Sequence, residues 1–395
     1  MSGPLSNLKV IELGTLIAGP YCARLLAEFG AEVVKVETPG EGDPLRKWRK
    51  LHEGNSLWWY AQARNKKSVA INLRTPEGQD VVRALAAHAD IVIENFRPGT
   101  LEKWGLGYDA LSRGNPGLVM VRLSGFGQTG PYKDRPGFGA IGESMGGMRH
   151  VTGYPDRAPV RVGISIGDSL AAMFGVIGAL MAIHHRQSSG RGQVVDVALY
   201  EAVFAMMEST LPEYCMTGFV RERSGASLPG IVPSNTYPCK DGKYVVIGAN
   251  ADSIFKRMMR AIGRPDLADD PSLATNDGRV RRTEELDRVI GEWTGRHDLA
   301  VVLEALDKAE VPSGKIYSIA DIAADLHYRA RGMIEDHKRD GVEVTLPGIV
   351  PKMSETPGET RWIGPKLGEH TDEVLAGCGF TRTEIAALRA RGVVA

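Results

Sequence analysis

One carboxylate, Asp168, follows a glycine-punctuated apolar segment, 162–167, and precedes a long apolar run, 169–183. The run predicts a mostly buried helix that ends at polar residues and then at Gly190. Asp168 should therefore lie at the N-terminus of this helix, where free N–H groups and the helix dipole favour a negative charge. Two interpretations are open at this point: a plain helix cap, or a carboxylate placed there for chemistry.

Cationic side chains gather in two short segments, 40–50, which also contains glycines and Trp48, and 64–68. Cations beside an aromatic side chain suit a phosphate-bearing ligand with an adenine to stack, although charge runs are more often solvated surface. The nearby turn, 14–20, lacks the GxGxxG spacing, and Pro20 stands where a P-loop has its lysine. Neither common phosphate-binding loop is therefore indicated.

The composition excludes several classes of protein. The chain has 395 residues, 43% of them hydrophobic and 24% charged, which predicts a soluble globular protein of about two domains. Lys+Arg and Asp+Glu balance at 48 each, so the charge favours neither nucleic acid nor an anionic membrane. Because four scattered cysteines lack metal-ligand spacing, we expect free thiols and no metal site. A strand-like segment that begins by Leu8 leaves no room for a signal peptide, so we expect a cytoplasmic protein without a membrane span.

Alternating strand-like and helical segments predict a parallel sheet with helical crossovers. The expected strands are 8–14, 31–37, 68–73, 90–96, 118–123 and 193–199, and the expected helices are 18–29, 75–88, 169–183, 200–211 and one near 367–375. Parallel strands end at one edge of the sheet, where α/β folds place ligands. Asn95 and Ser124, which follow two of the strands, should either face a crevice there or serve as turn residues.

The composition changes after residue 211, which suggests a domain boundary. Residues 212–231 are rich in Gly, Pro, Ser and charge and are expected to be a linker. A small α+β domain, 232–318, should follow, with strands 234–237 and 243–247 joined through a hairpin signal and with helices 253–262, 284–293 and 299–309. We expect residues 319–395 to return to the large domain that residues 1–211 begin.

A series of short segments in this order resembles the class III CoA-transferases, over essentially the whole chain. The matching segments are 10–13 with 18–20, 30–37, 42–43 with Arg46, 65–68, 94–99, Gly167-Asp168, 190–193 and 329–333. The resemblance implies an α/β fold in which a Rossmann-like large domain is built from both chain ends and a small α+β domain is added. It also implies an interlocked homodimer, with active sites between the large domain of one chain and the small domain of the other.

By this resemblance Asp168 matches the family's nucleophile. A carboxylate that is ionised at neutral pH can attack a thioester carbonyl, which implies mixed anhydrides and an aspartyl-CoA thioester on Asp168. The implied activity moves CoA from an acyl-CoA such as succinyl-CoA to another small carboxylic acid, with the CoA thioester as substrate and no tightly bound cofactor. A second carboxylate on the acceptor would need cations, for which Arg149, His150 and Arg161 are candidates, so we expect a dicarboxylate.

The resemblance also assigns residues to CoA and to a lid. The expected CoA contacts are Thr15, Leu16, Ile17, Ala18, Ile71, Arg74, Asn95, Phe96, Lys103 and Arg135. Thr38 stands where some relatives have an arginine, and Arg46 is the candidate to replace that ionic contact. The glycine-containing segment from Gly225 to Gly230 is expected to be the lid that excludes water from the anhydrides.

The chain departs from the family pattern ahead of Asp168. Phe138 and Gly139 replace a tyrosine and an acidic residue of relatives, and Glu143 replaces a glutamine, so the acceptor pocket is expected to be altered. The α-methylacyl-CoA racemases share the fold but need a histidine near Phe138, which argues against that alternative. A non-catalytic nucleotide-binding protein is the alternative from another class, and the intact Gly167-Asp168 pair argues against it.

Overall fold

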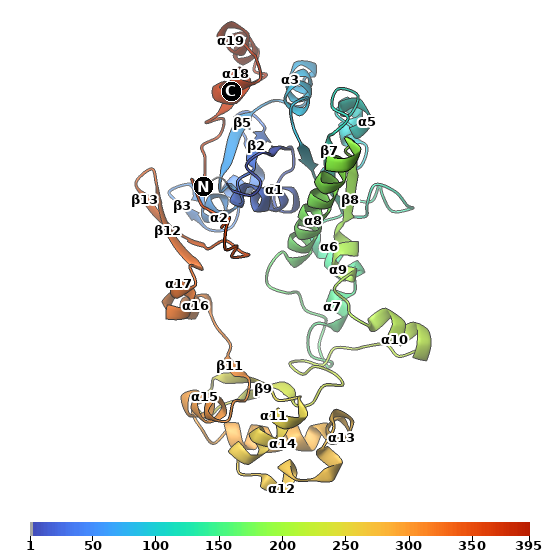
Figure 1. The fold of residues 1–395 in the computed structure, drawn as a ribbon, viewed down its shortest axis with the longest axis vertical. Helices are drawn as coiled ribbons and strands as arrows, with labels where there is room; N and C mark the ends of the chain where they lie inside the picture. Colours follow the sequence, from blue (N-terminus) through green and yellow to red (C-terminus); the bar gives the residue numbers. More distant parts are fainter. Residues whose placement is uncertain (1–2) are drawn as a thin grey trace. The chain divides into compact units, whose positions relative to one another are not determined.

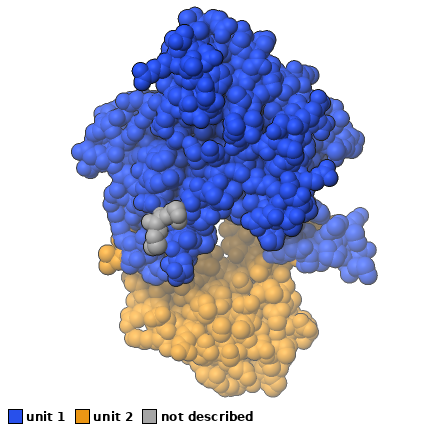
Figure 2. All heavy atoms as spheres, turned by 45° about the horizontal axis from the view of Figure 1, so that its top comes forward, with its two compact units in different colours: residues 1–148, 162–218, 327–395 blue, residues 149–161, 219–326 orange. Residues whose placement is uncertain are grey.

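The structure is a computed structural model that describes residues 3–395, and these divide into two compact units. Unit 1 contains residues 1–148, 162–218 and 327–395, and unit 2 contains residues 149–161 and 219–326. Figure 2 colours the two units separately. Each unit has its own hydrophobic core. The large unit therefore takes residues from both ends of the chain.

A six-stranded parallel sheet forms the centre of unit 1 (Figure 1). Its strands are β1 (Lys9–Glu12), β2 (Glu32–Glu37), β5 (Lys66–Ala70), β6 (Ile91–Glu94), β7 (Val119–Ser124) and β8 (Val194–Ala198). Val and Ile dominate the strands, as expected for strands that are buried on both faces. The order β5-β2-β1-β6-β7-β8 is that of a Rossmann-type doubly wound sheet. Successive strands are added toward β5 on one side of β1 and toward β8 on the other side, so the order of the strands reverses between β1 and β6. This switch point is where such folds bind ligands.

Helices cover both faces of the sheet. One face packs against α1 (Ala18–Glu28), α8 (Ile166–Ser189) and α9 (Leu199–Phe204). The other face packs against α3 (Pro76–Ala86), α4 (Thr100–Lys103), α5 (Tyr108–Leu111), α18 (Thr371–Gly377) and α19 (Arg382–Ala390). Because α18 and α19 bring Leu375 and Leu388 into this second core, the C-terminal segment completes the large unit. A mixed α/β fold with a parallel central sheet follows from these layers.

Helix α8 has 24 residues and is the one helix within residues 3–395 that is long and apolar enough to cross a membrane. Of its most apolar window, 44% is buried inside the protein. Leu170, Ala172 and Ala179 belong to the core that α8 shares with α1 and β7. The helix ends at Gly190 in the left-handed conformation, φ 68°, as the sequence predicted.

Shorter elements complete unit 1. They are a 3₁₀ helix (Pro44–Lys47), β3 (Leu51–His52), β4 (Asn55–Ser56), α2 (Leu57–Gln62), α6 (Gly139–Met145), β12 (Ile334–Arg339) and β13 (Val342–Pro347). Two short helices, α7 (Met148–Val151) and α17 (Leu326–Ala330), lie where the chain passes between the units.

Unit 2 is a three-stranded antiparallel sheet with helices packed against it. The strands are β9 (Ser234–Pro238), β10 (Tyr244–Gly248) and β11 (Ser313–Lys315), in the order β11-β10-β9. The helices of residues 219–326 are α11 (Asp252–Ala261), α12 (Pro265–Ala268), α13 (Asn276–Arg281), α14 (Thr283–Thr294), α15 (Leu299–Lys308) and α16 (Ile319–Ala324). Both predicted strands and all three predicted helices of this region are present.

The structure corrects three expectations about the elements. The single helix expected over 200–211 is two helices, α9 and α10 (Thr210–Thr217). The second begins two residues before Pro212, since proline is tolerated only in the first turn of a helix. The expected linker 212–231 therefore starts inside α10. Residues 149–161, expected in the large domain, and 319–326, expected in the return segment, cluster with unit 2.

Candidate active site

Asp168 lies in the first turn of α8 and is half-buried. The N-cap of this helix is Ser165, so Asp168 is the third helical residue and not the cap. The simple cap interpretation is therefore wrong, although the predicted placement at the helix N-terminus is correct. A carboxylate in the first turn is stabilised in its charged form by the helix dipole.

The backbone of Gly139, the first residue of α6, lies directly against the Asp168 carboxylate. A Cβ atom placed on Gly139 would be 2.1 Å from Asp168 Oδ2, and a Cβ on Gly167 would be 3.0 Å from the Gly139 carbonyl oxygen. These two glycines therefore let α6 and α8 approach closely at the nucleophile candidate. Phe138 precedes Gly139 and is 70% exposed, whereas Glu143 is 1% exposed. Of the three residues of the altered family pattern, Gly139 and Glu143 thus belong to the helix beside Asp168 and Phe138 is its N-cap.

A cavity of about 150 Å³ lies at the carboxyl ends of β1, β2, β5 and β6. Four of the residues expected to bind CoA line it: Thr15, Ile71, Arg74 and Phe96. Phe96 packs edge-on against Trp104, with ring centroids 5.4 Å apart, and Trp104 also lines the cavity. Trp104, rather than Trp48, is the tryptophan at this cavity, and it was missed because nothing in its sequence context indicates a ligand.

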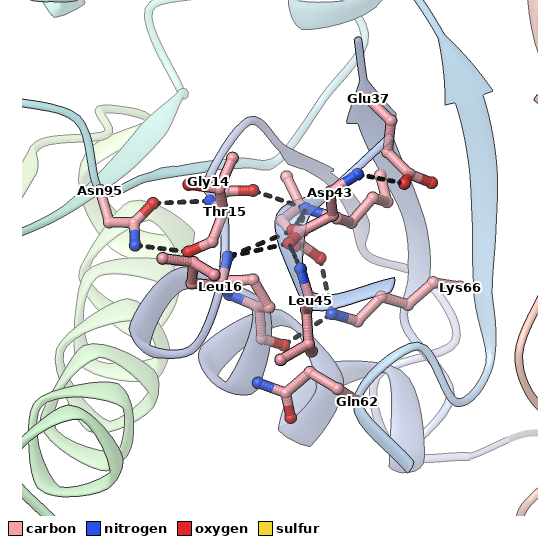
Figure 3. A network of polar contacts seen from close by, with 12 residues as sticks. Gly14, Thr15, Leu16, Glu37, Asp43, Leu45, Gln62, Lys66 and Asn95 are labelled. Carbon is pink, nitrogen blue, oxygen red and sulfur yellow. Dashed lines mark hydrogen bonds and ion pairs between the residues drawn. The ribbon is translucent and has the colours of Figure 1, made fainter. Parts of the chain in front are cut away.

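The turn after β1 is held by Asn95, which follows β6 across the switch point (Figure 3). The Thr15 N–H donates to Asn95 Oδ1 and Asn95 Nδ2 donates to the Thr15 carbonyl oxygen, both at 2.8 Å. Gly14 and Gly19 lie tightly against the same amide group. Asn95 therefore positions the turn, and Ser124 is a turn residue that accepts the Gly127 N–H.

The next peptide of the turn is held by Asp43. Leu16 has the positive φ of 65°, which is costly for a non-glycine residue and is sustained only where surrounding contacts fix it. Its N–H donates to both carboxylate oxygens of Asp43, at 3.1 and 3.2 Å. Burial alone would raise the pKa of Asp43, but the ion pair with Lys35, at 2.8 Å, holds it below its usual value.

Two buried lysines anchor the ends of the turn. Lys35 Nζ donates to the Gly14 carbonyl oxygen at 2.5 Å and pairs with Glu12 at 2.9 Å. Lys66 Nζ donates to the Pro20 carbonyl oxygen at 2.6 Å and pairs with Glu12 at 2.7 Å. Burial lowers the pKa of Lys66 to about 8, with Glu12 opposing the shift, whereas Asp43 and Glu12 overcome burial and raise the pKa of Lys35.

This ion network has one visible signal in the amino-acid sequence. Lys35 interrupts a run of valines in β2, and a lysine in a strand that is buried on both faces needs a buried acidic partner. Which carboxylate supplies that partner depends on the order of the strands. Leu16, Ile17 and Ala18, which were expected to contact CoA, thus lie in a turn whose geometry the buried ion network fixes. Gln62 Nε2 also donates a hydrogen bond to the Ile17 carbonyl oxygen at 3.1 Å.

Arg46 is engaged within the protein. Its Nε and Nη2 donate to the two carboxylate oxygens of Glu37 at 2.7 and 2.8 Å, and Nη1 donates to the Pro365 carbonyl oxygen at 3.1 Å. The guanidinium also lies 3.8 Å from the centre of the Trp59 ring. These contacts give Arg46 a structural role, and the expected phosphate contact stays a prediction.

Lys103 and Arg135 are exposed cations of unit 1. Lys103 is the last residue of α4, and Arg135 stacks 3.7 Å from the centre of the Tyr132 ring. Gly225 and Gly230 lie in unit 2, and both have a positive φ. Arg149, His150 and Arg161 also lie in unit 2. Their roles as lid and as acceptor-binding cations stay predictions.

The sequence matches CoA-transferase family III over residues 5–371. The chain is 53% identical to the succinyl-CoA–D-citramalate CoA-transferase of Chloroflexus aurantiacus, with 99% of this chain and 98% of that protein aligned. It is 43% identical to the beta subunit of the succinyl-CoA–L-malate CoA-transferase of the same organism, over 99% and 98% of the two chains. A crystal structure of a CaiB/BaiF family protein from Brucella suis superposes with a TM-score of 0.84 at 35% identity, covering 96% of this chain and all of that one.

The two curated relatives named above are CoA-transferases and align over nearly the whole chain, which argues against the racemase and the non-catalytic nucleotide-binding protein. The chain belongs to CoA-transferase family III and is an enzyme of that class.

Proposed function

We propose that the enzyme transfers CoA from succinyl-CoA to a small dicarboxylic acid, with Asp168 as the nucleophile. The observation behind this proposal is the Asp168 carboxylate in the first turn of α8, against the backbone of Gly139. The names of relatives support the substrates, because they pair succinyl-CoA with D-citramalate and L-malate. A relative from Agrobacterium fabrum, 36% identical, is a succinate–glutarate CoA-transferase.

The proposed reaction begins when an Asp168 oxygen attacks the thioester carbonyl of succinyl-CoA. The C–S bond breaks, CoA leaves as its thiolate, and a mixed succinyl–aspartyl anhydride remains. The thiolate then attacks the aspartyl carbonyl, which releases succinate and leaves CoA as a thioester on Asp168. The acceptor carboxylate attacks this thioester, the C–S bond breaks, and CoA leaves as its thiolate while a second anhydride forms. The thiolate then attacks the acceptor carbonyl, and the bond from that carbonyl to the Asp168 oxygen breaks. The new acyl-CoA leaves and the Asp168 carboxylate is regenerated.

We propose that the nucleotide end of CoA occupies the cavity at the switch point of the sheet. Its aromatic wall, formed by Phe96 and Trp104, suits an adenine ring. Arg74 is exposed at the rim of the same cavity and could pair with a phosphate group. Side-chain hydrogen bonds hold the backbone of the turn that begins at Thr15 in place. A fixed backbone of this kind suits the close approach of CoA.

We propose a homodimer as well. Met173, Ile177, Leu180 and Met181 form an exposed apolar row along α8, and an apolar stripe of this kind is typical of an interface. The family resemblance makes a second copy of the chain the expected partner. Sedimentation velocity of the wild type and of Met181→Glu tests this, because a dimer that becomes monomeric in the variant is expected. A monomeric wild-type protein would remove this part of the proposal.

The covalent route is tested by incubating the enzyme with succinyl-CoA, adding hydroxylamine and analysing the peptide that contains Asp168 by mass spectrometry. A hydroxamate on Asp168 that requires succinyl-CoA is expected, because hydroxylamine cleaves an acyl thioester or anhydride. Asp168→Asn should give no hydroxamate and should still bind CoA. An unmodified peptide from wild-type protein that binds CoA and turns over would show that Asp168 is not the nucleophile. Acceptor preference follows from assays with D-citramalate, L-malate and glutarate beside butyrate.

A further inference from the structure

A second cavity in unit 1 adjoins the N-terminus of α8 and has a volume of about 420 Å³. It is lined by the segment 163–165, by Leu57 and Trp58 of α2, and by Arg49 and Lys50. Ser165, the N-cap of α8, precedes Asp168 by three residues, which corresponds to about 5 Å along a helix axis. The cavity therefore begins within the length of a small organic acid from the proposed nucleophile.

Arg49 and Lys50 differ from the nearby Arg46 and Arg64 in having no carboxylate partner. Within residues 3–395 neither makes an ion pair, and both side chains are exposed. Arg49 makes only a distant ring contact, 5.3 Å from the centre of the Trp58 ring. Arg46 and Arg64, by contrast, are paired with Glu37 and Glu28. The two cations at the cavity are thus available to a negatively charged ligand.

The backbone of Arg49 has the positive φ of 62°. This conformation is unfavourable for a residue with a side chain, and such residues concentrate at functional sites where the surrounding structure maintains them. Arg49 lies between the 3₁₀ helix that contains Arg46 and the hairpin formed by β3 and β4. Arg49 therefore lies at a sharp turn of this loop, and its side chain lines the cavity.

The remaining walls of the cavity are apolar and aromatic. Leu57 and Ile164 are exposed large hydrophobic residues, and Trp58 is half-buried. A short hydrocarbon chain would be covered by these side chains, while a carboxylate at its far end would meet the cations. Arginine suits this role because its planar guanidinium binds a carboxylate through two parallel hydrogen bonds.

We infer that Arg49, assisted by Lys50, binds the distal carboxylate of the acyl group that reacts at Asp168. The inference rests on the proposed function and deepens it by naming a specificity residue. The succinyl group and the dicarboxylate acceptor occupy the site in turn, so the same guanidinium serves both half-reactions. Substrates that lack the second carboxylate gain no binding free energy from the Arg49 guanidinium.

The test compares succinyl-CoA with butyryl-CoA, which has the same chain length and a methyl group in place of the distal carboxylate. Binding is measured by calorimetry in an Asp168→Ala background, where no turnover occurs. Adding Arg49→Ala is expected to weaken succinyl-CoA binding by about 10- to 100-fold, the effect of losing a charged hydrogen-bonded pair. Butyryl-CoA binding should change by no more than about twofold, and Arg49→Lys should restore part of the loss.

The matched control is Arg113→Ala, an exposed arginine in unit 1 for which no ion pair exists within residues 3–395. It should change neither affinity. In the enzyme with Asp168 intact, Arg49→Ala should raise KM for succinyl-CoA and for the dicarboxylate together, with kcat for a monocarboxylate unchanged. Equal losses for succinyl-CoA and butyryl-CoA would overturn the inference while leaving the proposed function in place. A wild-type enzyme that forms no adduct on Asp168 would instead refute the proposed function, and the calorimetric comparison would still decide the role of Arg49.

Discussion

A methyl group added at Gly139 should displace the nucleophile without harming the fold. In the Gly139→Ala variant, the new Cβ would lie 2.1 Å from Asp168 Oδ2 and 2.8 Å from Asp168 Cγ. Real Cβ atoms essentially never approach other heavy atoms closer than 3.0 Å, so the carboxylate must move by on the order of 1 Å. A misplacement of about 1 Å in a reacting group can cost about 100-fold in rate. We therefore expect kcat to fall by about that factor.

The variant should otherwise resemble the wild type. Alanine favours a helix over glycine by about 1 kcal/mol, so the free energy of unfolding should not collapse, and CoA binding at the distant cavity should persist. Gly377→Ala is the matched control, because Gly377 ends α18 in open space. The assays are kcat for CoA transfer, the yield of Asp168 hydroxamate and the melting temperature. A Gly139→Ala enzyme with wild-type kcat would refute the placement of Asp168 against this backbone.

Two further predictions concern the turn after β1. Asn95→Ala removes two 2.8 Å hydrogen bonds to Thr15, so it should destabilise the protein by about 1–3 kcal/mol and also weaken CoA binding in calorimetry. The control is Asn115→Ala, which removes hydrogen bonds to the Ala86 and Ala89 carbonyl oxygens and should lower stability without changing CoA affinity. Equal CoA affinities of the Asn95→Ala and Asn115→Ala variants would contradict this prediction. Because the folded pKa of Asp43 is lowered below 3.8, its contribution to stability is present above that pH and is lost as the pH falls further. Urea unfolding between about pH 6 and about pH 3 should thus show a flatter pH dependence for Asp43→Asn than for the wild type, and parallel curves would argue against the ion pair.

The elements of the fold were largely predictable because their patterns are local. Runs of β-branched residues and helical spacing indicated all six strands of the sheet and the long helices α1, α3 and α8, but not the short helices α2, α4, α5 and α6. The start of β5 was placed two residues late, since Lys66 and Lys67 do not look like strand residues. Lys66 is buried only because Glu12, on a different strand, pairs with it. A strand boundary that depends on a distant charge is not visible in its own segment.

The amino-acid sequence by itself determined the order of the βαβ units, the helix that carries Asp168 near its N-terminus and, through its segment matches, the family. The tertiary structure decided which polar residues form hydrogen bonds and ion pairs with one another. It joined Asn95 to Thr15 across the switch point, joined Asp43 to Leu16, paired Arg46 with Glu37, and left Arg49 without an ion pair. The physical reason is that periodicity and propensity act over a few residues, whereas the environment of a charge is set by whatever the chain brings beside it.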